Sequence, residues 1–365
     1  MLVGQKIEEC GLIVVSTTRR ATLSNGDVYV EMTKRLYRES AYLTRILRKL
    51  MTPEEANILL ALPATPADLS ARFGLDEEAM KSKLKEFTER GLAVPSKGQL
   101  RFASDVARLH DATLSSAEKW VDTELLDLWR EFYEKDWFDA MNEGPKNLPQ
   151  PVIRIIPALK ALEQSPHISS NDVLPQENIR ELIRSANVIA IVPCTCRRSM
   201  RRCHAPLDNC LQFNRGAEYS INRGAGRKLS ADEAIAIAEE AEEAGLVHTW
   251  PFPPNFFEIC NCCRDCCSLF DGGIYFGTLD KVMEKTRFRA EIDEDICTGC
   301  KDCVERCYFG AIEMVESGQK NNLKAALNPD KCFGCGLCVV GCNMEAIAMK
   351  LAPKLGRISG KEQTS

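Results

Sequence analysis

Hydrophobic residues recur at helical spacing near the start of this sequence. Over residues 35–50 the apolar side chains that share one side of a helix are Leu36, Leu43, Ile46, Leu47 and Leu50. Before them, residues 12–17 and 27–32 have the pattern of strands, and Asn25-Gly26 between them favours the positive φ of a tight hairpin turn. The pattern therefore predicts a hairpin over residues 11–32 and a helix over residues 35–50.

Residues 52–103 carry the start and stop signals of a compact unit. Thr52 and Glu55 have capping-box spacing, and Pro53 suits the first position of a helix. We expect helices over residues 53–62, 66–73 and 76–90, and then a two-stranded hairpin over residues 92–102 that turns at Lys97-Gly98. This order of elements resembles a winged helix-turn-helix.

The charge of this unit does not favour a nucleic-acid interface. Residues 51–110 contain eight Lys and Arg residues against nine Asp and Glu residues. Acidic residues dilute the basic residues of the expected recognition helix, which are Lys81, Lys83, Lys85 and Arg90. Because nucleic-acid binding depends on a concentrated positive face, we expect a docking or scaffolding module without a nucleic-acid partner.

The pattern continues with helices and a linker. Aromatic residues crowd residues 111–141, which is typical of a core or of the subunit interface of a homo-oligomer. Residues 144–151 contain three prolines and mark a linker. We expect helices over residues 153–162 and 176–185 and a buried strand over residues 188–192. A further helix is expected over residues 230–245, with a capping box at Ser230 and Glu233 and its end at Gly245.

Cysteines near the C-terminus form two runs with one spacing. The first run is Cys297, Cys300, Cys303 and Cys307, and the second is Cys332, Cys335, Cys338 and Cys342. Each cysteine of the second run lies 35 residues after its counterpart, and Ala-Ile pairs at 311 and 346 repeat at the same offset. This regularity indicates an internal duplication. In such runs neighbouring cysteines of one loop bind different irons of a cubane, and the fourth usually serves the other cluster.

Residues 290–351, about a sixth of the chain, resemble the bacterial ferredoxins that carry two [4Fe–4S] clusters. The resemblance implies one cluster held by Cys297, Cys300, Cys303 and Cys342. It implies a second cluster held by Cys332, Cys335, Cys338 and Cys307. Tyr308 and Asn343 replace the proline that this family usually has after each fourth cysteine, which changes the local turn rather than the ligands. Zinc also takes four thiolates, but eight cysteines in this spacing favour iron–sulfur clusters.

Nine further cysteines lie in the middle of the chain. They are Cys194, Cys196, Cys203, Cys210, Cys260, Cys262, Cys263, Cys266 and Cys267. Nine thiols exceed the ligands of one cluster and nearly suit two. We expect an additional iron–sulfur site among them, with structural zinc and a few buried thiols as the alternative. Their spacing leaves the cluster type and the ligands open, and His204 and His248 are interpreted as hydrogen-bonding residues.

Charge separates the two cysteine regions. Residues 186–230 contain eight Lys and Arg residues and two Asp and Glu residues. Residues 291–350 contain six Lys and Arg residues and ten Asp and Glu residues. Four arginines stand between Cys196 and Cys203, and arginine beside thiolates offsets their charge and raises a reduction potential. The basic region also suits an acidic electron carrier or a phosphate group.

Composition and the sequence ends favour a cytoplasmic metalloprotein. The chain has 18 cysteines and four histidines, and residues 1–9 lack the pattern of a secretory signal. Its longest apolar runs are too short to span a bilayer, so we expect no membrane insertion. Thiolates on metal in a reducing cytoplasm explain the cysteines better than secreted disulfides do. No catalytic motif or dinucleotide or flavin signature stands out, although flavin sites are often unmarked.

The sequence thus predicts an α+β multi-domain protein with a mostly helical N-terminal half. The expected parts are a hairpin plus helix (1–50), a winged-helix-like module (51–110), a helical region and linker (111–185), a cysteine-rich α/β metal-binding domain (186–290), a two-cluster ferredoxin-type domain (291–351) and a flexible tail (352–365). The whole chain resembles multi-domain iron–sulfur proteins of anaerobic metabolism.

We expect electron transfer, in which single electrons pass to or from a redox partner such as a flavoenzyme or another iron–sulfur protein. Two alternatives remain open. One is a reductase subunit whose catalytic site is the central cysteine-rich region, and the other is a redox-sensing regulator that binds DNA.

Overall fold

The structure is a computed structural model that describes residues 27–251, 257–317 and 323–352. It divides into two compact units, residues 1–136 and 137–365. The predicted strand over residues 12–17, its turn at Asn25-Gly26, Cys10 and residues 353–365 of the predicted tail lie outside the described ranges. Both units combine helices with strands, and no helix within those ranges is long and apolar enough to cross a bilayer.

The strand predicted over residues 27–32 is wrong, because these residues begin a helix, α1 (Val28–Leu36). The Asp27 side chain accepts a hydrogen bond from the backbone N–H of Tyr29 (3.0 Å) and caps the helix. The buried residues Tyr29, Met32, Thr33 and Leu36 recur at helical spacing. The buried side chains therefore follow the period of a helix and not the strand-like alternation of Val28 and Val30.

The predicted helix over residues 35–50 is interrupted at residues 37–40. Its second part is α2 (Ala41–Leu50), where Ser40 caps the helix by accepting from the N–H of Leu43 (3.1 Å). The predicted apolar face of α2 is confirmed, since Leu43, Ile46, Leu47 and Leu50 are all buried.

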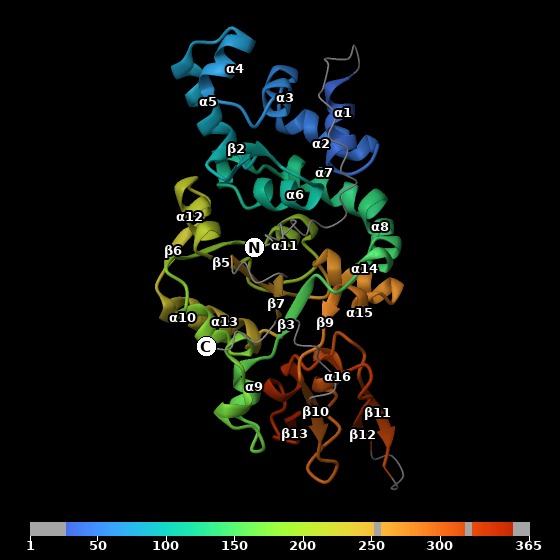
Figure 1. Cartoon of the computed structure of the whole chain (residues 1–365). Coiled ribbons are helices and arrows are strands. Elements are labelled where there is room, and N and C mark those ends of the chain that lie inside the picture. The colour runs from blue at the N-terminus through green and yellow to red at the C-terminus, as the bar shows by residue number, and fades with distance from the viewer. Residues whose placement is uncertain (1–26, 252–256, 318–322, 353–365) are drawn as a thin grey trace, which may run out of the picture. The chain divides into compact units, whose positions relative to one another are not determined.

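The elements predicted over residues 52–103 are present. They are α3 (Pro53–Leu60), α4 (Pro66–Phe73), α5 (Glu77–Glu89) and an antiparallel hairpin of β1 (Ala93–Ser96) and β2 (Gln99–Phe102) (Figure 1). The capping box of α3 is confirmed, because Glu55 N–H donates to the Thr52 hydroxyl (3.3 Å) and Thr52 N–H donates to the Glu55 carboxylate (3.1 Å). The first unit ends with α6 (Val106–Leu114) and α7 (Thr123–Phe132).

Carboxylates of the same unit pair with basic residues around α5. Lys83 and Arg90 both reach Glu55, at 3.2 and 3.1 Å. Lys81 pairs with Glu77 and Glu78 one turn earlier in the helix. Three of the four basic residues of the expected recognition helix, Lys81, Lys83 and Arg90, therefore pair with carboxylates of the same unit.

A seven-stranded sheet organises the second unit. Its strand order is β6-β4-β5-β8-β7-β3-β9, and all described neighbours are antiparallel except the parallel pair β3–β9. The strands are β3 (Ile153–Ile156), β4 (Ile189–Pro193), β5 (Asp208–Phe213), β6 (Arg227–Leu229), β7 (Val247–Pro251), β8 (Glu258–Cys262) and β9 (Met283–Glu284). The buried strand predicted over residues 188–192 is confirmed as β4.

The helix predicted over residues 153–162 is wrong in its first half, which forms β3. Pro151 and Pro157 bracket this segment, and its β-branched isoleucines favour a strand. Only α9 (Leu159–Glu163) is helical there.

Helices pack against the sheet. One core joins apolar residues of β4, β5 and β8 to α10 (Ile179–Arg184) and α13 (Ala231–Glu243). The remaining helices of the sheet domain are α11 (Thr195–Met200), α12 (Arg215–Asn222), α14 (Ser268–Phe276) and α15 (Leu279–Val282), while α8 (Phe138–Glu143) precedes it.

The C-terminal module, residues 287–352, contains two short antiparallel pairs (Figure 1). These are β10 (Phe288–Ile292) with β13 (Ile347–Leu351), and β11 (Ile312–Glu316) with β12 (Leu323–Leu327). The cysteine runs lie beside α16 (Asp302–Arg306) and α17 (Leu337–Val340). Backbone hydrogen bonds tie the module to the segment around α9, since Ala158 N–H donates to Cys335 O (2.8 Å) and Met349 N–H donates to the Ser165 hydroxyl (2.7 Å).

The capping box of α13 gives a first test of the fold. Ser230 and Glu233 cap each other's backbone N–H groups at 2.8 and 3.2 Å, as predicted. We expect Ser230→Ala to lower the free energy of unfolding by about 1 kcal/mol, measured by denaturant titration. Ser82→Ala, at an exposed position inside α5, is the matched control and should change it by less than about 0.5 kcal/mol. Equal effects of the two substitutions would contradict the cap.

Candidate metal centres

Glycines with positive φ allow the loops of the C-terminal module to wrap tightly. At Gly299 (φ +75°), a Cβ atom would lie 2.2 Å from the Leu323 carbonyl oxygen. At Gly334 (φ +73°), it would lie 2.0 Å from the Thr286 hydroxyl and 2.1 Å from the Phe288 carbonyl oxygen. Only glycine fits such positions, because both the backbone angle and the space exclude a side chain.

The two cysteine runs cross over around two separate cavities. Four cysteines line the first cavity: Cys297, Cys300, Cys303 and Cys342. Four line the second: Cys307, Cys332, Cys335 and Cys338. Each cavity thus receives three cysteines of one run and the fourth cysteine of the other. Apolar side chains complete the walls, among them Met314 and Ile347 in the first cavity and Phe333 and Met349 in the second.

These cavities suit a negatively charged sulfur-ligated group. Ala311 N–H donates to the Cys307 sulfur (3.2 Å) and Ala325 N–H donates to the Cys297 sulfur (3.5 Å), and such donors stabilise charge on sulfur. Burial raises the pKa of Cys303 to about 11 and that of Cys335 to about 12. The thiolates therefore need a positive partner, which a metal centre supplies.

The central cysteines come from several distant segments. Cys194 follows β4, Cys196 lies in α11 and Cys203 lies in the loop after it. Cys210 belongs to β5, and Cys260 and Cys262 belong to β8. A turn after β8 carries Cys263 and Cys266, and Cys267 directly precedes α14. The structure thus brings the four cysteines of residues 194–210 and the five cysteines of residues 260–267 to one end of the sheet domain.

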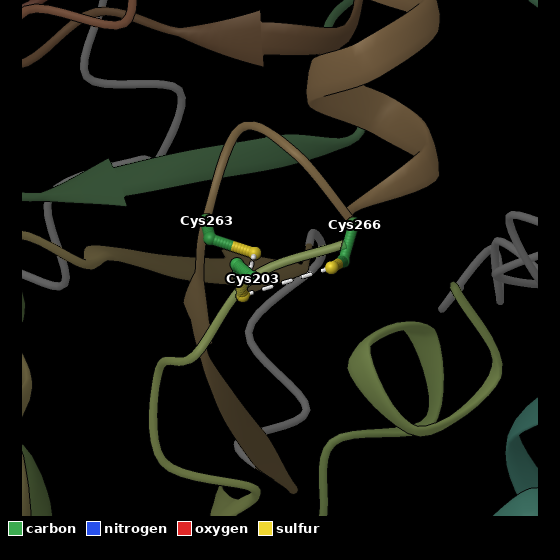
Figure 2. A group of neighbouring side chains, drawn as sticks. All are labelled: Cys203, Cys263 and Cys266. Carbon is green, nitrogen blue, oxygen red and sulfur yellow. Dashed lines mark hydrogen bonds between the residues drawn. The ribbon is translucent and has the colours of Figure 1, made fainter. Parts of the chain in front are cut away.

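Three of the central cysteines converge on one point. The sulfur of Cys203 lies 3.6 Å from that of Cys263 and 3.7 Å from that of Cys266. Figure 2 shows Cys263 and Cys266 on the same turn, with Cys203 reaching them from another segment. The hydrogen bond from Cys266, helped by the charge of Arg197, lowers the pKa of Cys263 to about 5.

A second group combines Cys210 and Cys260 with Glu258, whose ligand atoms lie within 4.8 Å of one another. Gln212 donates to both the Cys210 sulfur (3.5 Å) and the Glu258 carboxylate (3.3 Å). Sequence reasoning missed Glu258 as a candidate ligand. Its position two residues before Cys260 in a strand, and thus on the same face, was the available signal.

The other central cysteines connect to these groups. Cys262 hydrogen-bonds with Cys260 and Cys267 and lies 3.4 Å from the Thr249 hydroxyl. Cys267 also hydrogen-bonds with Cys196. Burial raises the pKa of Cys194. Hydrogen bonds thus connect Cys196, Cys210, Cys260, Cys262 and Cys267 in one group, and Cys203, Cys263 and Cys266 in another.

The interpretation of His248 as a hydrogen-bonding residue is confirmed. Its Nδ1 lies 2.6 Å from the Asn261 side-chain oxygen and its Nε2 lies 3.2 Å from the Glu242 carboxylate. Both His248 and Glu242 are fully buried. His204 is exposed and is in neither of the two metal-ligand groups found among the described residues.

Arg197 is the arginine that the fold places among the thiols. It is 3% exposed, and its guanidinium donates to Asn261 O (3.0 Å), to the Asn209 side chain (3.3 Å) and to Pro206 O. It also hydrogen-bonds with Cys263. Both Arg197 and Arg198 of the basic segment between Cys196 and Cys203 are buried, and Arg197 brings its positive charge to Cys263.

Aromatic residues connect the central cysteines with the second cavity. Phe270, three residues after Cys267, packs edge-on against Tyr308 with ring centroids 5.8 Å apart. Phe309 stacks on Phe333 of the second cavity at 4.3 Å. The pKa of Tyr308 is raised by burial and by the nearby sulfurs of Cys263 and Cys335. One apolar core thus includes cysteines of both regions.

Comparison with known proteins supports the C-terminal module. Residues 296–346 match the family described as a 4Fe-4S dicluster domain. A stretch of 31 residues is 58% identical to an iron-sulfur subunit of the CoB–CoM heterodisulfide reductase of Methanopyrus kandleri. That stretch covers 8% of this chain and 5% of the relative. The predicted resemblance to two-cluster ferredoxins is therefore confirmed for this module, and iron–sulfur electron transfer is the chemistry it supports.

Proposed function

We propose that the protein transfers single electrons through two [4Fe–4S] clusters. The first cluster is held by Cys297, Cys300, Cys303 and Cys342. The second is held by Cys307, Cys332, Cys335 and Cys338. The observation that carries this proposal is the crossed arrangement of the two runs around two separate cavities. Clusters supply the one-electron chemistry, while the protein sets their potentials through backbone donors, burial and charge.

The two clusters have different surroundings. Cys300 is exposed, so the first cluster is the one that a redox partner reaches. Cys335, which would hold the second cluster, lies near Tyr308, and Tyr308 is also close to Cys263 of the central cysteines. We propose that electrons enter or leave at the first cluster and pass through the second toward the central region. A flavoenzyme or another iron–sulfur protein is the proposed partner, and the name of the Methanopyrus relative makes a disulfide reductase system a candidate setting.

The central region is proposed to hold further metal, with an iron–sulfur cluster among its thiols as the leading hypothesis. Cys262 and Cys267 share an apolar core with the C-terminal module, and Cys260 packs against that core. A catalytic role within a reductase is the second candidate function, because Glu258 joins two thiols in a group of mixed ligands. The DNA-binding regulator draws no support from the pairing of Lys81, Lys83 and Arg90 with carboxylates.

Electron transfer tests the proposal in the full chain. Anoxically purified protein is reduced with dithionite, freed of excess reductant and mixed with an oxidised one-electron flavoprotein in a stopped-flow instrument. The expected result is rapid formation of flavin semiquinone as the iron–sulfur absorbance recovers. The variant Cys303→Ala/Cys335→Ala, which removes a ligand from each cluster, should transfer electrons at least about 100-fold more slowly. Equal rates for the wild type and the variant would refute the proposal.

A further inference from the structure

We infer that Cys203, Cys263 and Cys266 bind a single divalent metal ion, separate from any iron–sulfur cluster. This inference deepens the proposed further metal site, but it does not depend on the clusters of the C-terminal module. The ion is a thiophilic one of the zinc or iron(II) class, because all three donors are sulfur.

The spacing of the sulfurs fits one ion. Two sulfurs bound to the same tetrahedral ion at about 2.3 Å lie about 3.8 Å apart. The distances from Cys203 to Cys263 and Cys266 are 3.6 and 3.7 Å. In a cubane each cysteine binds a different iron, so the sulfurs spread around the cluster instead of converging.

The C-terminal module provides an internal comparison. Its eight cysteines surround two cavities, and among the described residues they form no group of three whose ligand atoms all lie within 4.8 Å. Cys203, Cys263 and Cys266 do form such a group. The same structure therefore distinguishes thiols arranged around a cavity from thiols arranged around a point.

The local sequence is also compatible with a mononuclear site. Cys263 and Cys266 are separated by two residues in a turn between β8 and α14, which is the spacing that structural zinc sites use for a pair of ligands. The backbone N–H of Arg202 hydrogen-bonds to Cys266. Such a donor orients a ligand and stabilises its charge.

Charge balance gives an independent argument. Arg197 is 3% exposed, and the oxygen atoms that it contacts belong to Pro206, Asn209 and Asn261, which are all uncharged. A buried guanidinium requires a negative partner, and Arg197 hydrogen-bonds with Cys263. Three thiolates on a divalent ion have a net charge of −1, and Arg197 places a buried positive charge beside one of them, Cys263.

Metal analysis of the full chain tests the inference. Zinc, iron and acid-labile sulfide are measured per chain in anoxically purified wild type, Cys203→Ser and Cys266→Ser. Each variant should lose about one zinc or one iron without losing sulfide. If the ion is zinc, zinc-edge X-ray absorption of the wild type should show three sulfur ligands at about 2.3 Å, and this measurement needs no variant.

Two results would overturn the inference. One is the loss of several irons together with matching sulfide, which would assign these sulfurs to a cluster. The other is unchanged metal content in folded variants. Cys342→Ala is the matched control, because it removes a proposed cluster ligand and should leave the single ion in place. A protein that binds the single ion but lacks the C-terminal clusters would uphold this inference and refute the proposed function.

Discussion

Replacing Cys342 with alanine should remove the cluster that sits among Cys297, Cys300 and Cys303, although Cys342 belongs to the other run. The expected loss is about four irons and four sulfides per chain, because a missing thiolate leaves one iron of that cubane without its protein ligand. Iron and sulfide analysis measures the loss. Cys10→Ala, which alters the cysteine outside both regions, should cause no loss.

Double variants separate the crossed arrangement from an uncrossed one. Cys342→Ala/Cys303→Ala should lose no more iron than either single variant, since both residues line the first cavity. Cys342→Ala/Cys338→Ala should lose about eight irons, because Cys338 lines the second cavity. The opposite ranking of the two double variants would refute the proposed ligand sets.

Gly334→Ala should be the most damaging single change outside the cysteines. Its Cβ atom would lie 2.0 Å from the Thr286 hydroxyl and 2.1 Å from the Phe288 carbonyl oxygen. We expect a loss of about 3 kcal/mol or more in unfolding free energy and at least one cluster missing after anoxic purification. Denaturant titration and iron analysis give the two readouts.

Gly310→Ala is the matched control for this prediction. Gly310 also has positive φ (+60°) and lies in the same module, but no atom lies within 4 Å of its added Cβ. The backbone strain alone should cost about 1–2 kcal/mol and leave the iron content unchanged. If Gly334→Ala and Gly310→Ala lose the same unfolding free energy and the same iron, the close contacts of Gly334 with Thr286 and Phe288 do not position the loop.

The sequence predicted the C-terminal module well because its chemistry is local. Cysteines two and three residues apart must lie in one tight loop, and the repeat at 35 residues identifies the partner loop. The crossed grouping around the cavities needed the resemblance to ferredoxins, since spacing within a run cannot show which loop supplies a fourth cysteine.

The grouping of the central cysteines could not be predicted from the sequence in the same way. Cys203 meets Cys263 only because β5 and β8 are neighbours in the sheet, and that neighbourhood joins residues about 50 positions apart in the chain. Glu258 was missed because its one signal, the position two residues before Cys260, has meaning only once residues 258–262 are known to form a strand. Pairing of distant strands, rather than local pattern, decides which of the nine thiols meet.

The errors in secondary structure have a different origin, because local signals were present. Residues 27–32 alternate like a strand, but the cap at Asp27 and the helical face that includes Met32 and Leu36 prevail. Residues 153–156 lie between Pro151 and Pro157 and are rich in isoleucine, which favours the strand that they form between β7 and β9.

Iron and acid-labile sulfide, counted per chain in anoxically purified protein, decide whether the C-terminal cysteines hold two [4Fe–4S] clusters. We expect at least about eight of each, with both falling by about four in Cys342→Ala. A colourless protein with fewer than about eight irons, or with zinc at the C-terminal cysteines, would contradict it.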